Sequence, residues 1–196
     1  MLFRSYPHEF SGGMRQRIMI ALALVLRPAV IVADEPTTAL DVLVEAQILR
    51  ILADLRRNFD TSLLMITHNL GIVAEACDRV AVMYAGRIVE QGSAYDVTSK
   101  PAHPYARELL RSTISLSTEA LHSIPGAPPD LVDPPPACRF HPRCPDAMQV
   151  CAAHWPPTIA VGPARRSECW LHDKEGIPEG LQEPLERKVL AVAEEA

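Results

Sequence analysis

Two acids and a histidine follow short apolar runs, in places where they could do phosphate chemistry. Asp34 and Glu35 end the run AVIVADE, and His68 ends the run SLLMITH. If both runs are parallel strands, their carboxyl ends meet at one sheet edge, where α/β proteins bind ligands. One carboxylate can hold Mg²⁺ through water, and its neighbour can take a proton from an attacking water. Taken singly, the two acids are typical of a solvated pair at a strand end, and the histidine is typical of a structural residue.

A second candidate site is the stretch SGGMRQR. Ser11, Gly12 and Gly13 precede a run of helix-forming residues that starts at Met14. Residues without a Cβ let backbone N–H groups approach a phosphate, and the helix dipole favours the negative charge there. Arg15 adds positive charge nearby. The alternative is a tight turn before a helix.

The elements that position these residues follow from hydrophobic periodicity. Short continuous apolar runs predict buried strands, and longer runs with a 3.6-residue period predict helices. Strands that alternate with helices predict an α/β fold with a parallel sheet covered on both faces. Helices are expected over residues 14–26, 41–59 and 69–77, and strands over 29–35, 62–68, 79–86 and 87–92, the last two as a hairpin.

In their order and spacing these motifs resemble those of the ATP-binding cassette (ABC) ATPases, which are RecA-like P-loop NTPases. FSGGMRQR is similar to the signature motif, VIVADE to Walker B, TALD to the D-loop and THNL to the switch-histidine region. The resemblance covers residues 5–92. It implies an ATP and Mg²⁺ site in which Asp34 helps to hold Mg²⁺, Glu35 is the general base and His68 contacts the γ-phosphate. It also implies that Ser11, Gly12, Gly13 and Arg15 meet ATP held by a second ATPase subunit, toward which the loop at Asp41 crosses.

The phosphate-binding loop G-x-x-x-x-G-K-[ST] does not occur in these 196 residues. That loop cradles the β- and γ-phosphates in P-loop enzymes. The sequence therefore predicts the C-terminal part of an ABC ATPase, which is not expected to hydrolyse ATP by itself. The alternative is a non-catalytic remnant or regulatory partner that docks on an intact ABC ATPase.

The last third of the chain resembles the C-terminal extension of oligopeptide, dipeptide and nickel importer ATPases. The resemblance rests on HPY at residues 103–105, on CRFHPRCPDAMQVC and on CWL. It implies a peptide importer, with permease subunits as partners and a peripheral place on the cytoplasmic face of the membrane. The net charge of −5 argues against a nucleic-acid-binding protein.

Four of the five cysteines gather in this extension: Cys138, Cys144, Cys151 and Cys169. Their wide spacing lacks the short knuckles of zinc sites and suits a cubane cluster, whose four irons lie apart. The resemblance also implies a 4Fe–4S cluster, while zinc, disulfides or idle thiols remain alternatives. The prolines between residues 125 and 163 exclude regular helix and central strand. Three regions are expected: residues 1–99 from the ATPase, 100–172 as the extension and 173–196 as a flexible tail.

Overall fold

The computed structural model describes residues 5–59, 61–112 and 123–185. It divides into two compact units, Met1–Ala76 and Cys77–Ala196, and each is described by itself. The expected boundary at residues 99 and 100 does not coincide with this division, and the three expected regions stay predictions. No helix in the described ranges is both long enough and apolar enough to cross a membrane.

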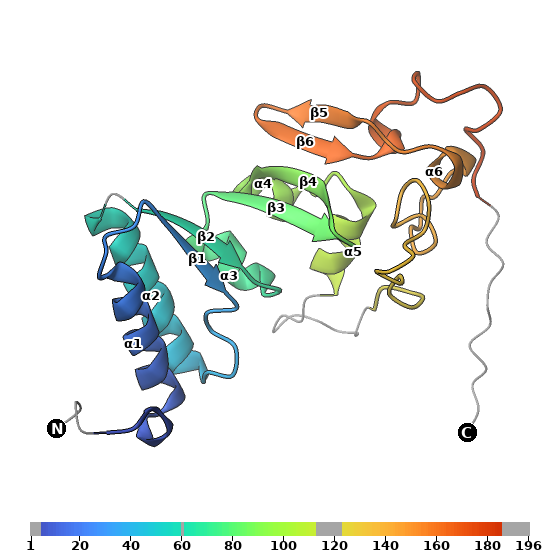
Figure 1. The fold of residues 1–196 in the computed structure, drawn as a ribbon. Helices are drawn as coiled ribbons and strands as arrows, with labels where there is room; N and C mark the ends of the chain where they lie inside the picture. The colour runs from blue at the N-terminus through green and yellow to red at the C-terminus, as the bar shows by residue number, and fades with distance from the viewer. Residues whose placement is uncertain (1–4, 60, 113–122, 186–196) are drawn as a thin grey trace, which may run out of the picture. The chain divides into compact units, whose positions relative to one another are not determined.

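The N-terminal unit alternates helices with two parallel strands (Figure 1). β1 and β2 pair in parallel, with Val30 opposite Ser62 and Asp34 opposite Ile66. This is the expected α/β arrangement with a parallel sheet. Its elements are η2 (Pro7–Glu9), α1 (Gly12–Leu24), β1 (Val30–Asp34), α2 (Val42–Asn58), β2 (Ser62–Ile66) and α3 (Leu70–Ala76).

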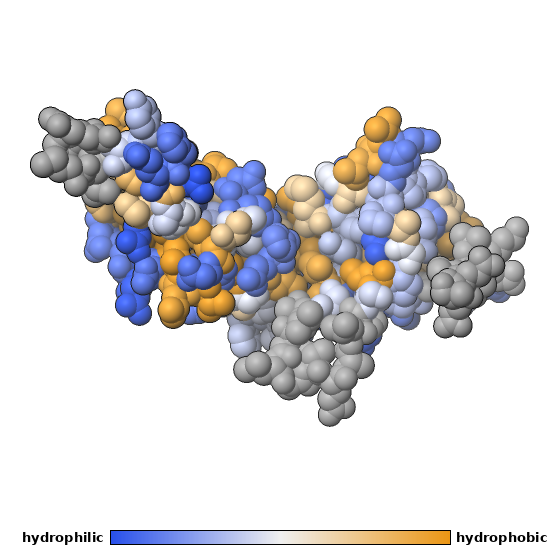
Figure 2. All heavy atoms as spheres, turned by 90° about the horizontal axis from the view of Figure 1, so that it is seen from below, coloured by the Kyte–Doolittle hydropathy of each residue, from blue (hydrophilic) through white to orange (hydrophobic). Residues whose placement is uncertain are grey.

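The prediction that these strands are buried on both faces is wrong for the described structure. Val30 and Val32 of β1 are 54% and 61% exposed, and Leu64 of β2 is 55% exposed. Apolar surface is visible over this unit in Figure 2. The alternate residues Ile31 and Leu63 are half-buried, so one face of the two-stranded sheet is covered much less than the other.

The C-terminal unit contains a four-stranded antiparallel sheet in the order β3-β4-β6-β5. β3 and β4 form the expected hairpin, in which Ala85 and Gly86 have φ values of +47° and +79°. Its elements are β3 (Arg79–Tyr84), β4 (Arg87–Ser93), α4 (Ala94–Ser99), α5 (Pro104–Arg111), α6 (Gln149–Ala153), β5 (Thr158–Gly162), β6 (Arg165–Glu168) and η3 (Trp170–His172).

Two features of this unit differ from the sequence expectation. α6 and β5 lie inside the proline-rich stretch, because each falls between prolines rather than across one. Part of the expected tail is packed: Ile177 is buried, and the Leu185 N–H donates to the Ala147 carbonyl. Residues 186–196 lie outside the described ranges.

The core of the C-terminal unit is built from two apolar clusters. The first contains the buried ring of Phe140, which packs against Tyr84 at 5.0 Å between ring centroids and against Tyr105 at 5.3 Å. The second surrounds Val150 and Trp170. Cys138 packs against both clusters, so the segment that carries the cysteines is held by ordinary apolar burial.

Candidate functional site

Glu35 and His68 meet at the carboxyl end of the parallel strand pair. Glu35 follows β1 directly, and His68 comes two residues after β2. His68 Nδ1 lies 2.7 Å from Glu35 Oε1. The expectation that these two side chains share one sheet edge is confirmed, because the parallel register brings the two strand ends together.

The Glu35 carboxylate is held on both of its oxygens. The Thr38 hydroxyl donates to Oε2 at 3.0 Å, and the Glu35 N–H donates to the Ile66 carbonyl at 2.9 Å. The backbone of Glu35 has a φ of +45°, in the left-handed region that residues other than glycine rarely occupy. Such strain is maintained only where the surrounding contacts enforce it, and it concentrates at functional sites.

The hydrogen bond from His68 lowers the pKa of Glu35 below its usual value. Desolvation acts against this shift, and the hydrogen bond from Thr38 adds to it. The carboxylate therefore stays ionised at neutral pH and can accept a proton from a bound molecule. Asp34, the last residue of β1, is exposed beside it and offers further oxygen ligands of the kind that Mg²⁺ prefers.

The glycines of the SGG stretch lie inside α1 rather than in a turn before it. Ser11 is the N-cap, and its hydroxyl accepts the Met14 N–H at 3.3 Å. A Cβ on Gly13 would lie 2.5 Å from Val44 Cγ1, so this glycine allows α1 to pack closely on the start of α2. The sequence analysis did not foresee this packing role.

The remaining signature and D-loop residues occupy the ends of the same two helices. Arg15 is exposed in the first turn of α1. Asp41 is the N-cap of α2, where its Oδ1 accepts the Val44 N–H at 2.9 Å. Aspartate is a favoured residue type at this position, because its carboxylate accepts a backbone N–H that has no partner within the helix.

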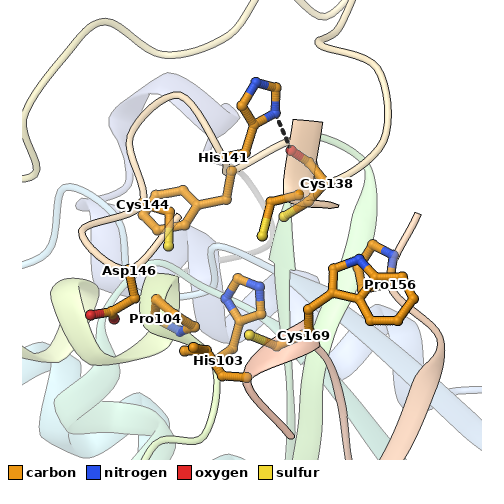
Figure 3. A pocket seen from close by; sticks show the side chains of 12 residues that line it. His103, Pro104, Cys138, His141, Cys144, Asp146, Pro156 and Cys169 are labelled. Atoms are coloured by element: carbon orange, nitrogen blue, oxygen red, sulfur yellow. Dashed lines mark hydrogen bonds between the residues drawn. The ribbon is translucent and has the colours of Figure 1, made fainter. Parts of the chain in front are cut away.

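In the C-terminal unit, the four clustered cysteines line a single cavity (Figure 3). The cavity is lined almost wholly by apolar atoms, and little free space lies between them. All four are free thiols, so the disulfide alternative is not seen. Cys138 and Cys151 are also joined through their backbones, because the Cys138 N–H donates to the Cys151 carbonyl at 3.1 Å.

Burial raises the pKa of each thiol in this cavity. The pKa rises to about 11 for Cys138 and to about 12 for Cys144 and Cys169, and that of Cys151 also rises. The thiols are therefore protonated at neutral pH in this arrangement. A metal that bound them would displace the protons, because the thiolate is the ligand.

The side chains around the cavity do not form a ready-made site for one ion. Within the described ranges, no group of three His, Cys, Asp or Glu side chains could hold a metal ion. The sequence expectation of a 4Fe–4S cluster is therefore not supported by the described residues, although the four cysteines line one cavity. A tetrahedral zinc site needs its sulfurs about 2.3 Å from a single point.

His103 is a residue whose importance the sequence analysis missed. Its ring is 1% exposed and lines the cysteine cavity, and its Nδ1 accepts the Tyr105 N–H at 3.0 Å. Burial lowers the pKa of His103 to about 3, and the charges of His172 and Arg107 act in the same direction, so the ring is neutral. The HPY motif was the available signal, since a histidine before proline can cap a helix that starts there.

A buried ion pair fixes the backbone at His103. Glu90 of β4 is 1% exposed and pairs with Arg165 of β6 at 2.6 Å. The same carboxylate accepts the N–H groups of Ala102 and His103, at 3.0 and 2.7 Å. The sequence did not single out Glu90, because an acid within a short strand is normally exposed.

Two family models match this chain, one within each of its two compact units. Residues 2–38 match the family described as "ABC transporter". Together with the Glu35–His68 pair at the end of a parallel sheet, this match defines the class: the chain is related to the ABC ATPases.

The C-terminal unit specifies the branch. Residues 89–151 match the family described as "Oligopeptide/dipeptide transporter, C-terminal region". The chain belongs to the oligopeptide/dipeptide branch of the ABC transporter ATP-binding proteins.

Individual relatives cover most of this chain. It is 53% identical over 169 residues to "Oligopeptide transport ATP-binding protein OppD" of Salmonella typhimurium. The aligned region covers 85% of this chain and 50% of the relative. It is 49% identical over 173 residues to "Dipeptide transport ATP-binding protein DppD" of Bacillus subtilis, over 87% of this chain and 52% of the relative. The chain thus spans about half the length of the curated relatives it matches.

One similar solved structure is that of cbiO1 from Clostridium perfringens, described as part of the ABC transporter complex cbiONQ. It is 34% identical, with a TM-score of 0.45, and the match covers 48% of this chain and 38% of that one.

Proposed function

We propose that this chain supplies the water-activating part of an ATP site in an ABC importer for peptides. The observation that carries the proposal is the Glu35 carboxylate, held by His68 and Thr38 at the end of a parallel sheet. Glu35 would take the proton of the water that attacks the γ-phosphate, and Asp34 would help to hold Mg²⁺. His68 keeps the Glu35 carboxylate ionised and fixed in position.

The partners in this proposal are permease subunits and a second ATPase subunit, at the cytoplasmic face of the membrane. The names of the relatives support peptide uptake as the process. Ser11, Gly12, Gly13 and Arg15, with the loop at Asp41, would face ATP held by that second subunit. The N-terminus of α1 suits this role, because its free N–H groups attract a phosphate.

The test is peptide-stimulated ATP turnover by an assembled importer that contains this sequence. Replacing Glu35 by Gln should lower turnover by about 10²–10⁴-fold, the usual contribution of a positioned general base. Glu45→Gln, a matched change at a half-buried acid of α2 outside the candidate site, should leave turnover unchanged. An importer that keeps its turnover with Glu35→Gln would refute the proposed role.

The isolated chain gives a second test. These 196 residues contain no phosphate-binding loop, so the chain alone should neither bind ATP tightly nor hydrolyse it. Steady turnover by the pure chain, abolished by Glu35→Gln, would show that it carries a complete site. If the chain is inert but alters turnover by an intact ATPase, the regulatory alternative is favoured.

We further propose that the cysteine cavity holds a 4Fe–4S cluster with a structural role. Four free cysteines line the cavity, but no three side chains there could hold one ion. A tetrahedral zinc site would need its sulfurs to converge on one point. A four-iron cluster takes one thiolate per iron, so its ligands line a wider space. Cys138, Cys144, Cys151 and Cys169 would hold the cluster and fasten the irregular segment to the sheet.

Metal analysis of anaerobically purified protein tests the cluster. We expect about four irons per chain and a broad absorption near roughly 400 nm. Cys144→Ser should remove both, whereas Cys77→Ser, at the cysteine outside the cavity, should keep them. One zinc per chain without iron or sulfide would replace the cluster by a zinc site.

A further inference from the structure

The cavity lined by the four cysteines also receives one buried polar side chain, that of His103. Figure 3 shows the His103 ring among Cys138, Cys144 and Cys169, and all of them line the same cavity. His103 is the N-cap of α5, and its Nδ1 accepts the Tyr105 N–H. In a neutral imidazole only one nitrogen carries a proton, so this hydrogen bond assigns the proton to Nε2.

The ring cannot readily turn to place that proton elsewhere. The His103 N–H is bound to the buried carboxylate of Glu90, and Pro104 follows immediately. On its other side the ring contacts Phe140, with the ring centroids 5.9 Å apart. Both the backbone and the ring are therefore fixed with Nδ1 toward the helix.

Within the described residues, the Nε2–H of His103 has no hydrogen-bond acceptor. Within the described residues, Arg107 Nε is the side-chain polar atom that is fully buried without a hydrogen-bond partner. Nε2 of His103 is not buried in this way. A donor N–H that faces a cavity gains from an acceptor placed there. The cavity is the space that this donor can reach.

We propose that His103 is the hydrogen-bond donor of the cysteine cavity, and that its Nε2–H binds a sulfur of the cluster held by Cys138, Cys144, Cys151 and Cys169. The inference rests on the cluster proposed above. Hydrogen bonds to the sulfurs help to set the reduction potential of iron–sulfur clusters. A donor favours the more negative, reduced state, so His103 raises the potential.

Two substitutions separate this role from helix capping. His103→Asn keeps a short side-chain acceptor, which is a favoured N-cap, but cannot reach into the cavity. His103→Gln places an amide N–H close to the position of Nε2, and it is a poor N-cap. A capping role predicts damage from Gln, whereas the donor role predicts an altered cluster with Asn.

The experiment uses the full chain loaded anaerobically with iron and sulfide. The reduction potential is measured by absorbance and by electron paramagnetic resonance, and folding is followed by tryptophan fluorescence. With His103→Asn we expect about four irons and a tenfold lower ratio of reduced to oxidised cluster at a fixed potential, about 59 mV for one electron. His103→Gln should stay closer to the unaltered protein.

The outcomes that overturn the inference differ from those that overturn the cluster. If the unaltered chain takes up no iron, the cluster and the donor role are both wrong. If it takes up iron and His103→Asn leaves the potential unchanged, the donor role alone is wrong. If the two variants lose iron equally, the role of His103 is structural and the inference also fails. Loss of iron in folded His103→Asn but not in His103→Gln supports it.

Discussion

The two units of this chain bury their apolar residues to very different extents. In the C-terminal unit, Phe140 and Val150 are almost fully buried within two apolar clusters. In the N-terminal unit, α1 has no buried residue, and Leu22 and Val32 are more than half exposed. The candidate ATP residues lie on the unit with little burial, and the cysteine cavity lies on the unit with much. Tertiary burial therefore stabilises one site, while hydrogen bonds between partly exposed side chains define the other.

The largest expected effect comes from removing Glu90, the buried carboxylate of the C-terminal unit. Glu90→Ala would leave Arg165 buried without its partner and would free two backbone N–H groups. We expect a loss of about 3–5 kcal/mol in the free energy of unfolding of this unit. Denaturant unfolding followed by tryptophan fluorescence reports on it, because Trp155 and Trp170 both lie there.

Glu168→Ala is the matched control for that change. Glu168 pairs with Arg87, whose side chain is 44% exposed, at 3.4 Å. An ion pair of this kind contributes less than about 1 kcal/mol. Equal losses from the two substitutions would show that the Glu90 network does not stabilise the unit in the way described.

A hydroxyl placed in each sheet tests the difference in burial directly. Val82→Thr, at a side chain 7% exposed, should cost about 1–3 kcal/mol, because the hydroxyl has no partner in the apolar cluster. Val32→Thr, at a side chain 61% exposed, should change stability by less than about 0.5 kcal/mol. Hydrogen exchange resolves the units separately. A large loss from Val32→Thr would mean that this face is covered.

A capping substitution tests whether local signals stabilise the N-terminal unit. Asp41→Ala removes the acceptor for the Val44 N–H at the start of α2 and should cost about 1 kcal/mol. Asp41→Asn keeps the acceptor and should cost only a small part of that. Far-ultraviolet circular dichroism during unfolding measures both. The contrast between the units would weaken if the alanine variant melted like the unaltered protein.

The smallest expected effect concerns the charge of Glu35. His68→Ala removes the main interaction that lowers the pKa of Glu35, so that pKa should rise toward its usual value. A larger fraction of the carboxyl is then protonated at any mildly acidic pH. Titration of the Glu35 carboxyl carbon by nuclear magnetic resonance measures the shift, with His8→Ala as the control. An unchanged pKa would mean that His68 does not hold the carboxylate in solution.

The sequence predicted those parts of the structure that depend on short-range patterns. Apolar runs and helical periodicity placed β1, α2 and β2 to within a few residues. The meeting of Glu35 with His68 followed from the parallel pairing of two such runs.

The parts that were missed depend on residues far apart in the chain. Glu90 and Arg165 are separated by 75 positions, and neither has a local pattern that marks a buried pair. The position of Gly13 against Val44 likewise depends on how two helices pack. β5 and α6 were excluded by the proline content, but each fits between prolines. A composition rule does not show where such gaps fall.

The pairing of β4 with β6 has a consequence for how the protein can be cut. Glu90 lies opposite Ser167 and Gln91 opposite Arg166, so the strand just before the expected boundary at residue 99 is bonded to a strand well beyond it. A fragment that ended at residue 99 would leave one side of β4 bare and open to another chain. The chain can therefore be divided at residue 99 only by splitting a sheet.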